Sequence, residues 1–85
     1  MKMKGKKYKV VWRFVTTKGW KSDAKYTMID AKTDNTARKK ALEILENMNS
    51  NIAKFLPRGG YRIEEIQGFE LVDLHCIYTR KVPLN

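Results

Sequence analysis

The clearest pattern near the N-terminus is an alternation of apolar and polar positions over residues 8–16. Most of this segment is β-branched or aromatic, which is typical of a β-strand with one buried face. Lys18-Gly19 follows and predicts a two-residue turn, because glycine takes a positive φ without strain. A second strand is expected within residues 20–31, so the first part of the chain forms a hairpin.

A two-residue turn fixes the register of this hairpin. It pairs Thr17 with Trp20 and Lys9 with Met28, and cross-strand neighbours share a face. The predicted core face consists of Tyr8, Val10, Trp12, Phe14 and Ile29. The opposite face carries Lys9, Val11, Arg13, Val15, Trp20, Tyr26 and Met28.

The next segment has the periodicity of an amphipathic helix. Its apolar stripe is formed by Ala37, Ala41, Ile44, Leu45 and Met48. Thr33 or Asp34 can cap the N-terminus by accepting hydrogen bonds from the free backbone amides. The run Arg38-Lys39-Lys40 is expected in the first turn, where positive charge is unfavourable against the helix dipole. That cost indicates a use such as phosphate contact, or else a solvated helix face. Residues 56–60 end the helical segment.

The remainder reads as a second hairpin, formed by residues 61–66 and 69–80 and turning at Gln67-Gly68. Its register predicts a core face of Tyr61, Ile63, Val72, Leu74, Cys76 and Tyr78. The order β-β-α-β-β predicts an α+β fold, a small antiparallel sheet with one amphipathic helix packed on one face. A chain of this length makes one domain, expected over residues 8–85 after a basic flexible tail of residues 1–7.

The charge is concentrated in the first half of the chain. The formal net charge is +9. Residues 1–40 hold thirteen Lys and Arg against three Asp, a balance of +10, whereas residues 41–85 balance at −1. A one-sided positive field attracts polyanions and speeds their encounter with the protein.

The sequence offers little catalytic or metal-binding chemistry. Asp73 and His75 share a strand face and could form an acid–base pair, but no serine or cysteine is placed to act as its nucleophile. One histidine and the single Cys76 cannot make a typical zinc site. We expect a nonenzymatic protein with no cofactor and no metal. No apolar run is long enough to cross a membrane and no secretion signal is recognisable, so an intracellular, cytoplasmic location without membrane contact is expected.

Two binding hypotheses remain. The first is a nucleic-acid-binding domain that uses the first hairpin and the N-terminal lysines, since Lys and Arg neutralise phosphates and aromatic rings stack on bases. Its candidate site residues are Lys9, Arg13, Lys18, Trp20, Lys21, Lys25, Tyr26, Arg38 and Lys39. The alternative is a small protein-interaction module, such as a phage-encoded regulator or inhibitor, that binds an acidic protein surface. Trp, Tyr, Met and Arg also favour protein interfaces.

Overall fold

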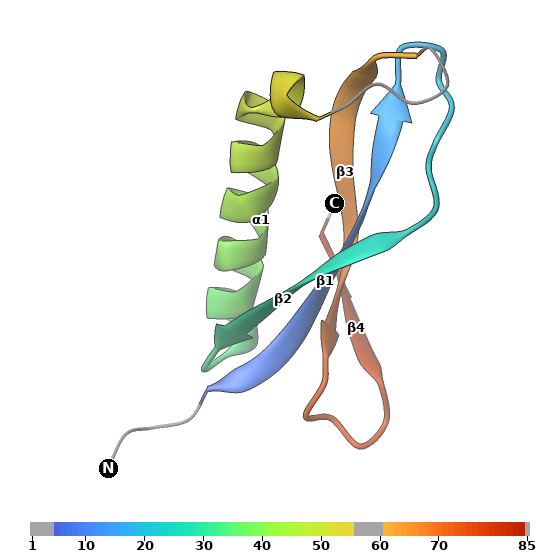
Figure 1. The fold of residues 1–85 in the computed structure, drawn as a ribbon. Helices are drawn as coiled ribbons and strands as arrows, with labels where there is room; N and C mark the ends of the chain where they lie inside the picture. Colours follow the sequence, from blue (N-terminus) through green and yellow to red (C-terminus); the bar gives the residue numbers. More distant parts are fainter. Residues whose placement is uncertain (1–4, 56–60, 85) are drawn as a thin grey trace.

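The computed structural model describes residues 5–55 and 61–84. The chain forms a four-stranded antiparallel sheet in the order β2-β1-β3-β4, with one helix on one face (Figure 1). The elements are β1 (Lys6–Thr16), β2 (Lys25–Ala31), α1 (Asp34–Ser50), the 3-10 helix η1 (Ile52–Lys54), β3 (Ile63–Asp73) and β4 (Arg80–Pro83). The predicted α+β fold and the element order are therefore confirmed.

The core lies between α1 and one face of the sheet. Alternate residues of β1 supply the sheet side, namely Tyr8, Val10, Trp12 and Phe14, all of them buried. The apolar stripe of α1 packs against them through Ala37, Ala41 and Leu45. Partly buried residues complete the margin, among them Ile29, Met48, Ile52 and Phe55. The predicted core face of the first hairpin is confirmed, and so is the helix stripe in Ala37, Ala41, Leu45 and Met48, whereas Ile44 lies outside the core cluster.

The start of α1 is as predicted, but its basic run lies deeper in the helix than expected. Thr33 is the N-cap and its side chain accepts a hydrogen bond from the Thr36 N–H. Because the helix begins at Asp34, the run Arg38-Lys39-Lys40 follows the first turn, where the dipole effect has largely decayed. Lys40 donates to the backbone oxygen of Asp30 at 2.7 Å. The unfavourable interaction of these cations with the helix dipole is therefore small, and it does not indicate that they have a function.

The first hairpin has the predicted register and a different turn. Lys9 pairs with Met28 as expected. The Thr16 N–H, however, donates to the Trp20 oxygen, and Gly19 has φ +79°. This is a three-residue loop with glycine as the left-handed residue. The extra residue is absorbed before Lys25, where the Ser22 hydroxyl accepts from the Phe14 N–H at 2.9 Å.

This turn corrects two predicted orientations. Trp20 lies opposite Thr16 rather than Thr17, and Lys21 pairs with Val15. Since cross-strand partners share a face, Trp20 occupies a helix-side register position and Lys21 one on the opposite face.

The predicted second turn is wrong. Gln67-Gly68 lies within β3, where Gly68 pairs with Trp12, and the chain reverses between Asp73 and Arg80. Several residues of the predicted core face are consequently exposed, namely Leu74 and Tyr78 in this loop and Tyr61 just before β3. Val72 is buried, but it lies on the face away from α1, and Leu71 enters the core instead.

The N-terminal boundary also differs from the expectation. Lys6 and Lys7 belong to β1 rather than to a tail, and Lys7 forms an ion pair with Asp30 of β2 at 3.1 Å. Residues 1–4, and residues 56–60 that were expected to end the helical segment, lie outside the described residues.

Candidate nucleic-acid interface

The sheet face away from α1 gathers residues from all four strands. Its β1 members alternate with the core residues, and their partners on β2, β3 and β4 follow from the registers. We call this surface the open face and define it by Lys9, Val11, Arg13, Tyr26, Met28, Glu70, Val72 and Lys81. Figure 1 shows α1 lying on one side of the sheet only, so the open face has no helix over it.

A hollow of about 330 Å³ lies within the open face. Val11 and Val72 contribute its buried apolar part. The other lining residues are Lys9, Ala24, Lys25, Tyr26, Glu70, Thr79 and Lys81. The bottom of the hollow is apolar, and cations and an aromatic ring surround it. Such a site suits a planar ligand with a negatively charged group attached to it.

Two cations of the open face lie over aromatic rings. The Lys9 ammonium is 5.1 Å from the centroid of Tyr26, and the Arg13 guanidinium carbon is 5.1 Å from the centroid of Phe69. A cation–π contact of this kind positions the cation without neutralising its charge, as a carboxylate would. Tyr26 remains 62% exposed, so part of its ring is available to a ligand.

The hairpin tip, residues Thr17 to Lys21, forms a second basic and aromatic surface. Trp20 is 50% exposed there. The Lys18 ammonium lies 5.7 Å from the centroid of Tyr61, and the Thr17 N–H donates to the Arg62 oxygen. Tyr61 and Arg62 were not predicted at this surface, because the second hairpin expected from the sequence placed Tyr61 in the core.

The nine predicted site residues fall in three places. Lys9, Arg13 and Tyr26 share the open face, while Lys18, Trp20 and Lys21 lie at the hairpin tip. The Lys25 ammonium is turned to the helix side and lies 5.6 Å from the centroid of Phe14. Arg38 and Lys39 are exposed on α1, on the other side of the sheet. The structure therefore brings six of the seven hairpin residues onto two surfaces, and it separates the Lys25 ammonium and the helix residues from both.

Ion pairs are concentrated at the opposite end of the sheet from the hairpin tip. Those among the described residues join Lys6 to Asp73, Lys7 to Asp30, Arg80 to Asp34 and Asp73, and Lys81 to Glu70. No described carboxylate forms an ion pair with Lys9, Arg13, Lys18, Lys21 or Lys25. The uncompensated positive charge of the hairpin thus lies on the open face, at the tip and along the β2 edge.

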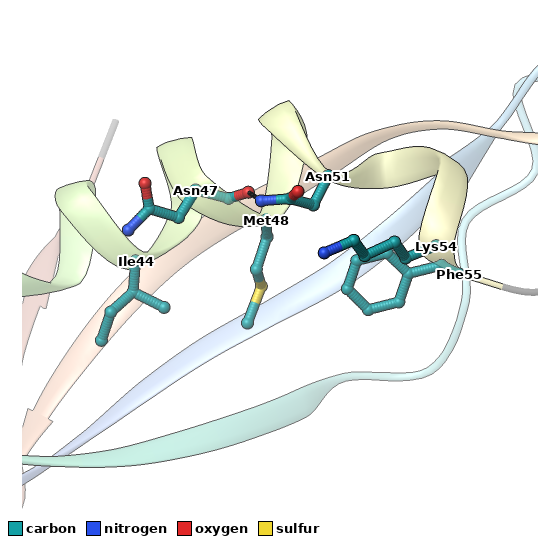
Figure 2. A pocket seen from close by; sticks show the side chains of 6 residues that line it. All are labelled: Ile44, Asn47, Met48, Asn51, Lys54 and Phe55. Carbon is teal, nitrogen blue, oxygen red and sulfur yellow. Dashed lines mark hydrogen bonds between the residues drawn. The ribbon is translucent and has the colours of Figure 1, made fainter.

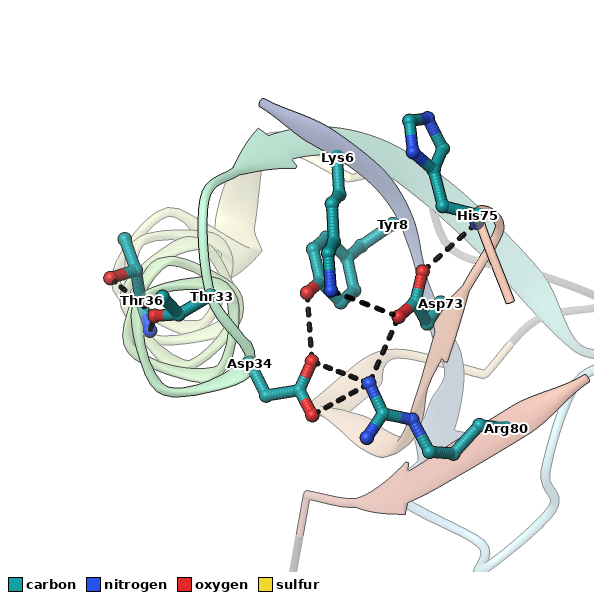
Figure 3. Close-up of polar contacts among 8 residues, drawn as sticks. All are labelled: Lys6, Tyr8, Thr33, Asp34, Thr36, Asp73, His75 and Arg80. Carbon is teal, nitrogen blue, oxygen red and sulfur yellow. Dashed lines mark hydrogen bonds and ion pairs between the residues drawn. The ribbon is translucent and has the colours of Figure 1, made fainter. Parts of the chain in front are cut away.

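The ion-paired end contains a polar cluster that includes the buried residues Tyr8 and Asp73 (Figure 3). Arg80 bridges Asp73 at 2.9 Å and Asp34 at 2.8 Å, and the Tyr8 hydroxyl donates to Asp34 at 2.7 Å. Burial alone would raise the pKa of Asp73. The hydrogen bonds from the His75 N–H and Arg80, together with the charges of Lys6 and Arg80, instead lower that pKa. The cluster ties α1, β1, β3 and β4 together.

Neither an acid–base pair nor a metal set is assembled among the described residues. It is the backbone N–H of His75, not its ring, that contacts Asp73, at 2.9 Å, and the His75 side chain is exposed. The described residues include no group of three or more His, Cys, Asp or Glu that could hold a metal ion. Within the same residues, no helix is long and apolar enough to cross a membrane.

An apolar groove of about 340 Å³ lies beside the C-terminal end of α1 (Figure 2). Ile44 and Met48 point into it from the helix, and Phe55 closes one end. Its remaining lining residues are Asn47, Asn51 and Lys54. With Lys54 as its one charged lining residue, the groove does not extend the basic surface.

Comparison with known proteins gives no relative for this chain: no family model matches, and no significant match is found among curated proteins or solved structures.

Proposed function

We propose that the chain is a nonenzymatic nucleic-acid-binding protein, and that it binds through the open face and the hairpin tip. The observation that carries this proposal is the separation of charge along the sheet. Cations at one end of the sheet are neutralised by ion pairs, Lys6 and Lys7 included. Towards the hairpin tip, Lys9, Arg13, Lys18 and Lys21 form no ion pair with a described carboxylate, and they lie among exposed aromatic side chains.

This arrangement suits a phosphate backbone better than an isolated anion. Lys9, Arg13 and Lys21 are spread along a strand and its turn rather than converging on one point. A spread of single charges matches the repeated phosphates of a nucleic acid, and releasing the counterions of those phosphates drives binding. Tyr26 and Trp20 add exposed rings on which bases can stack.

Titration of labelled single-stranded and double-stranded oligonucleotides at several salt concentrations tests the proposal. We expect binding that weakens steeply as salt rises. Lys21→Ala removes one uncompensated cation of the tip, so it should lower the affinity for all sequences alike and reduce the salt slope by about one unit. Trp20→Ala should weaken single-strand binding by about 1–3 kcal/mol if its ring stacks on a base.

Lys54→Ala is the matched control. It removes the same charge from an exposed position on η1, in the helix layer, and should leave both affinity and salt slope nearly unchanged. The proposal is wrong if no oligonucleotide binds at low salt, because charge attraction alone should be measurable there.

A second candidate function is supported by the loop between β3 and β4. This loop exposes Leu74, Ile77 and Tyr78, whose exposed fractions are 43%, 91% and 84%. Arg80 and Asp73 hold its base through their hydrogen bond. A fixed loop with exposed apolar side chains is typical of a protein-binding element, so a protein-interaction module is the alternative. In that case the hairpin would meet the acidic part of the partner surface.

Variants of this loop separate the two functions. Ile77→Ser and Tyr78→Ser change side chains that are almost fully exposed, so the fold should be unaffected. A nucleic-acid-binding protein should keep its oligonucleotide affinity in both variants. A protein-interaction module should instead lose a partner captured from nuclease-treated extract, with Leu42→Ser on the exposed side of α1 as the control.

A further inference from the structure

The hollow of the open face contains a feature that phosphate binding does not require. Glu70 lines it, with its side chain 24% exposed and its carboxylate 3.7 Å from the Lys81 ammonium. A carboxylate repels phosphates, and it accepts hydrogen bonds without donating any. Beside it are the apolar floor of Val11 and Val72 and the exposed ring of Tyr26. This combination suits a planar group with hydrogen-bond donors along one edge.

A base within a duplex cannot reach this hollow. The four strands of the sheet, about 4.8 Å apart, span roughly 14 Å between the outer strands, whereas the major groove is roughly 12 Å wide. The sheet therefore cannot enter the groove with its face toward the bases. An unpaired base can turn away from its strand and lie in the hollow against Tyr26, as aromatic side chains commonly allow in single-strand recognition.

We propose that the hollow binds an unpaired guanine of a single strand, with Glu70 accepting hydrogen bonds from its N1–H and its 2-amino group. This inference rests on the proposed function. The two oxygens of a carboxylate match two parallel N–H donors, and guanine is the base that presents two adjacent donors on its pairing edge. Lys9 already lies over the ring of Tyr26, so the base stacks on the exposed remainder of that ring. A phosphate next to the base meets Lys9, which forms no ion pair with a described carboxylate, while Lys81 remains paired with Glu70.

The test uses short strands of oligothymidine (DNA) and of oligouridine (RNA), each with or without one central guanine. Binding is measured by fluorescence anisotropy. The guanine strand should bind about tenfold more tightly, which is the discrimination that a bidentate base contact provides. Glu70→Gln should abolish this preference, because an amide offers only one acceptor oxygen, while the strand without guanine binds at least as well as before. Glu65→Gln is the matched control. It removes the same charge from the strand position opposite Val15, outside the hollow, and should keep the preference.

Further arms of the experiment distinguish the ways in which the inference could fail. Tyr26→Ala should weaken the binding of all single strands. Because Tyr26 is largely exposed, this substitution should not unfold the protein. Guanosine monophosphate should compete only at concentrations far above those of the strand, because it lacks the neighbouring phosphates. Equal binding of strands with and without guanine overturns the inference and leaves the proposed function standing. Retention of the preference in Glu70→Gln, or competition by the mononucleotide as strong as by the strand, also overturns it. Absence of binding to every oligonucleotide overturns both.

Discussion

Gly68 lies on the helix side of β3, directly beneath Leu45 of α1. An added Cβ at this position would overlap a Leu45 methyl group. Gly19 has a positive φ, but Gly68 does not. Glycine is therefore needed at position 68 because there is no room for a side chain, not because of its backbone conformation. A glycine within a strand often marks such a close approach. The distance between helix and sheet therefore depends on one missing side chain.

Gly68→Ala should lower the free energy of unfolding by about 1–3 kcal/mol, the usual cost of overfilling a packed core. Leu45→Ala should lower it by about 2–5 kcal/mol through the cavity that it leaves. In the double variant the added methyl group occupies the space that Leu45 vacates, so the two effects should partly cancel. Urea denaturation of the four proteins measures this coupling. Simple additivity of the two single-variant effects would contradict the proposed contact.

Individual residues were predictable from the sequence where the local pattern determines them. The alternation in β1 identifies Tyr8, Val10 and Trp12 as core residues. The sequence also limits the N-cap of α1 to Thr33 or Asp34, of which the structure has Thr33. Gly68 was not predictable in this way. Locally it has the signature of a turn, whereas in the structure it pairs with Trp12 in the sheet and glycine is needed there because of Leu45, a residue of another element.

At the scale of the elements, the two hairpins differ in how well the sequence encodes them. The first turns at a glycine with φ +79° and keeps its predicted register over β2. The second turns through a loop that contains Leu74, Ile77 and Tyr78, whose composition is that of a strand. In addition, β3 has register shifts against β1 next to Trp12 and Thr16. Each shift moves the following residues to the other face, so alternation alone misassigns the second half of the chain.

The C-terminal end of α1 shows a further contact between elements that no local pattern reveals. β4 covers β3 only between Glu70 and Asp73. Further along that edge, the Asn49 side chain accepts from the Ile66 N–H at 2.8 Å and donates to the Ile66 oxygen at 3.0 Å. An asparagine that weakens the helix by its propensity thus satisfies the backbone of an uncovered strand edge.

At the scale of the whole molecule, charge is separated along a shape that measures 49 × 25 × 18 Å. The sequence predicted a basic first half, but not which of its cations are neutralised. Among the described residues these are Lys7, which pairs with Asp30 across the first hairpin, and Lys6, whose partner Asp73 is far from it in the chain. The candidate site was accordingly predictable in its hairpin residues. Its contributions from β3 and β4, Glu70 and Lys81, became visible only with the fold.

The polar cluster at that end should also make stability depend on pH in the alkaline range. Burial, the hydrogen bond to Asp34 and the negative charges of Asp34 and Asp73 raise the pKa of Tyr8 from 10.0 to about 12. Between these values the unfolded chain releases the phenol proton and the folded chain retains it. The contribution of Tyr8 is therefore complete below pH 10 and is lost as the pH rises toward 12. By pH 11 the loss should reach about 1.4 kcal/mol, the equivalent of one pKa unit.

Urea denaturation between pH 8 and pH 11 measures this loss. Tyr8→Phe should be less stable than the wild type at pH 8, because Asp34 loses its hydrogen bond from the hydroxyl. The difference between the two proteins should then shrink by about 1.4 kcal/mol toward pH 11, since the variant has no phenol to titrate at this position. All other groups are common to the two proteins, so their contributions cancel in the comparison. Tyr78→Phe, which removes an exposed hydroxyl, should follow the wild type throughout. A constant difference between wild type and Tyr8→Phe across this range would show that the Tyr8 hydroxyl is not held by Asp34 in the folded protein.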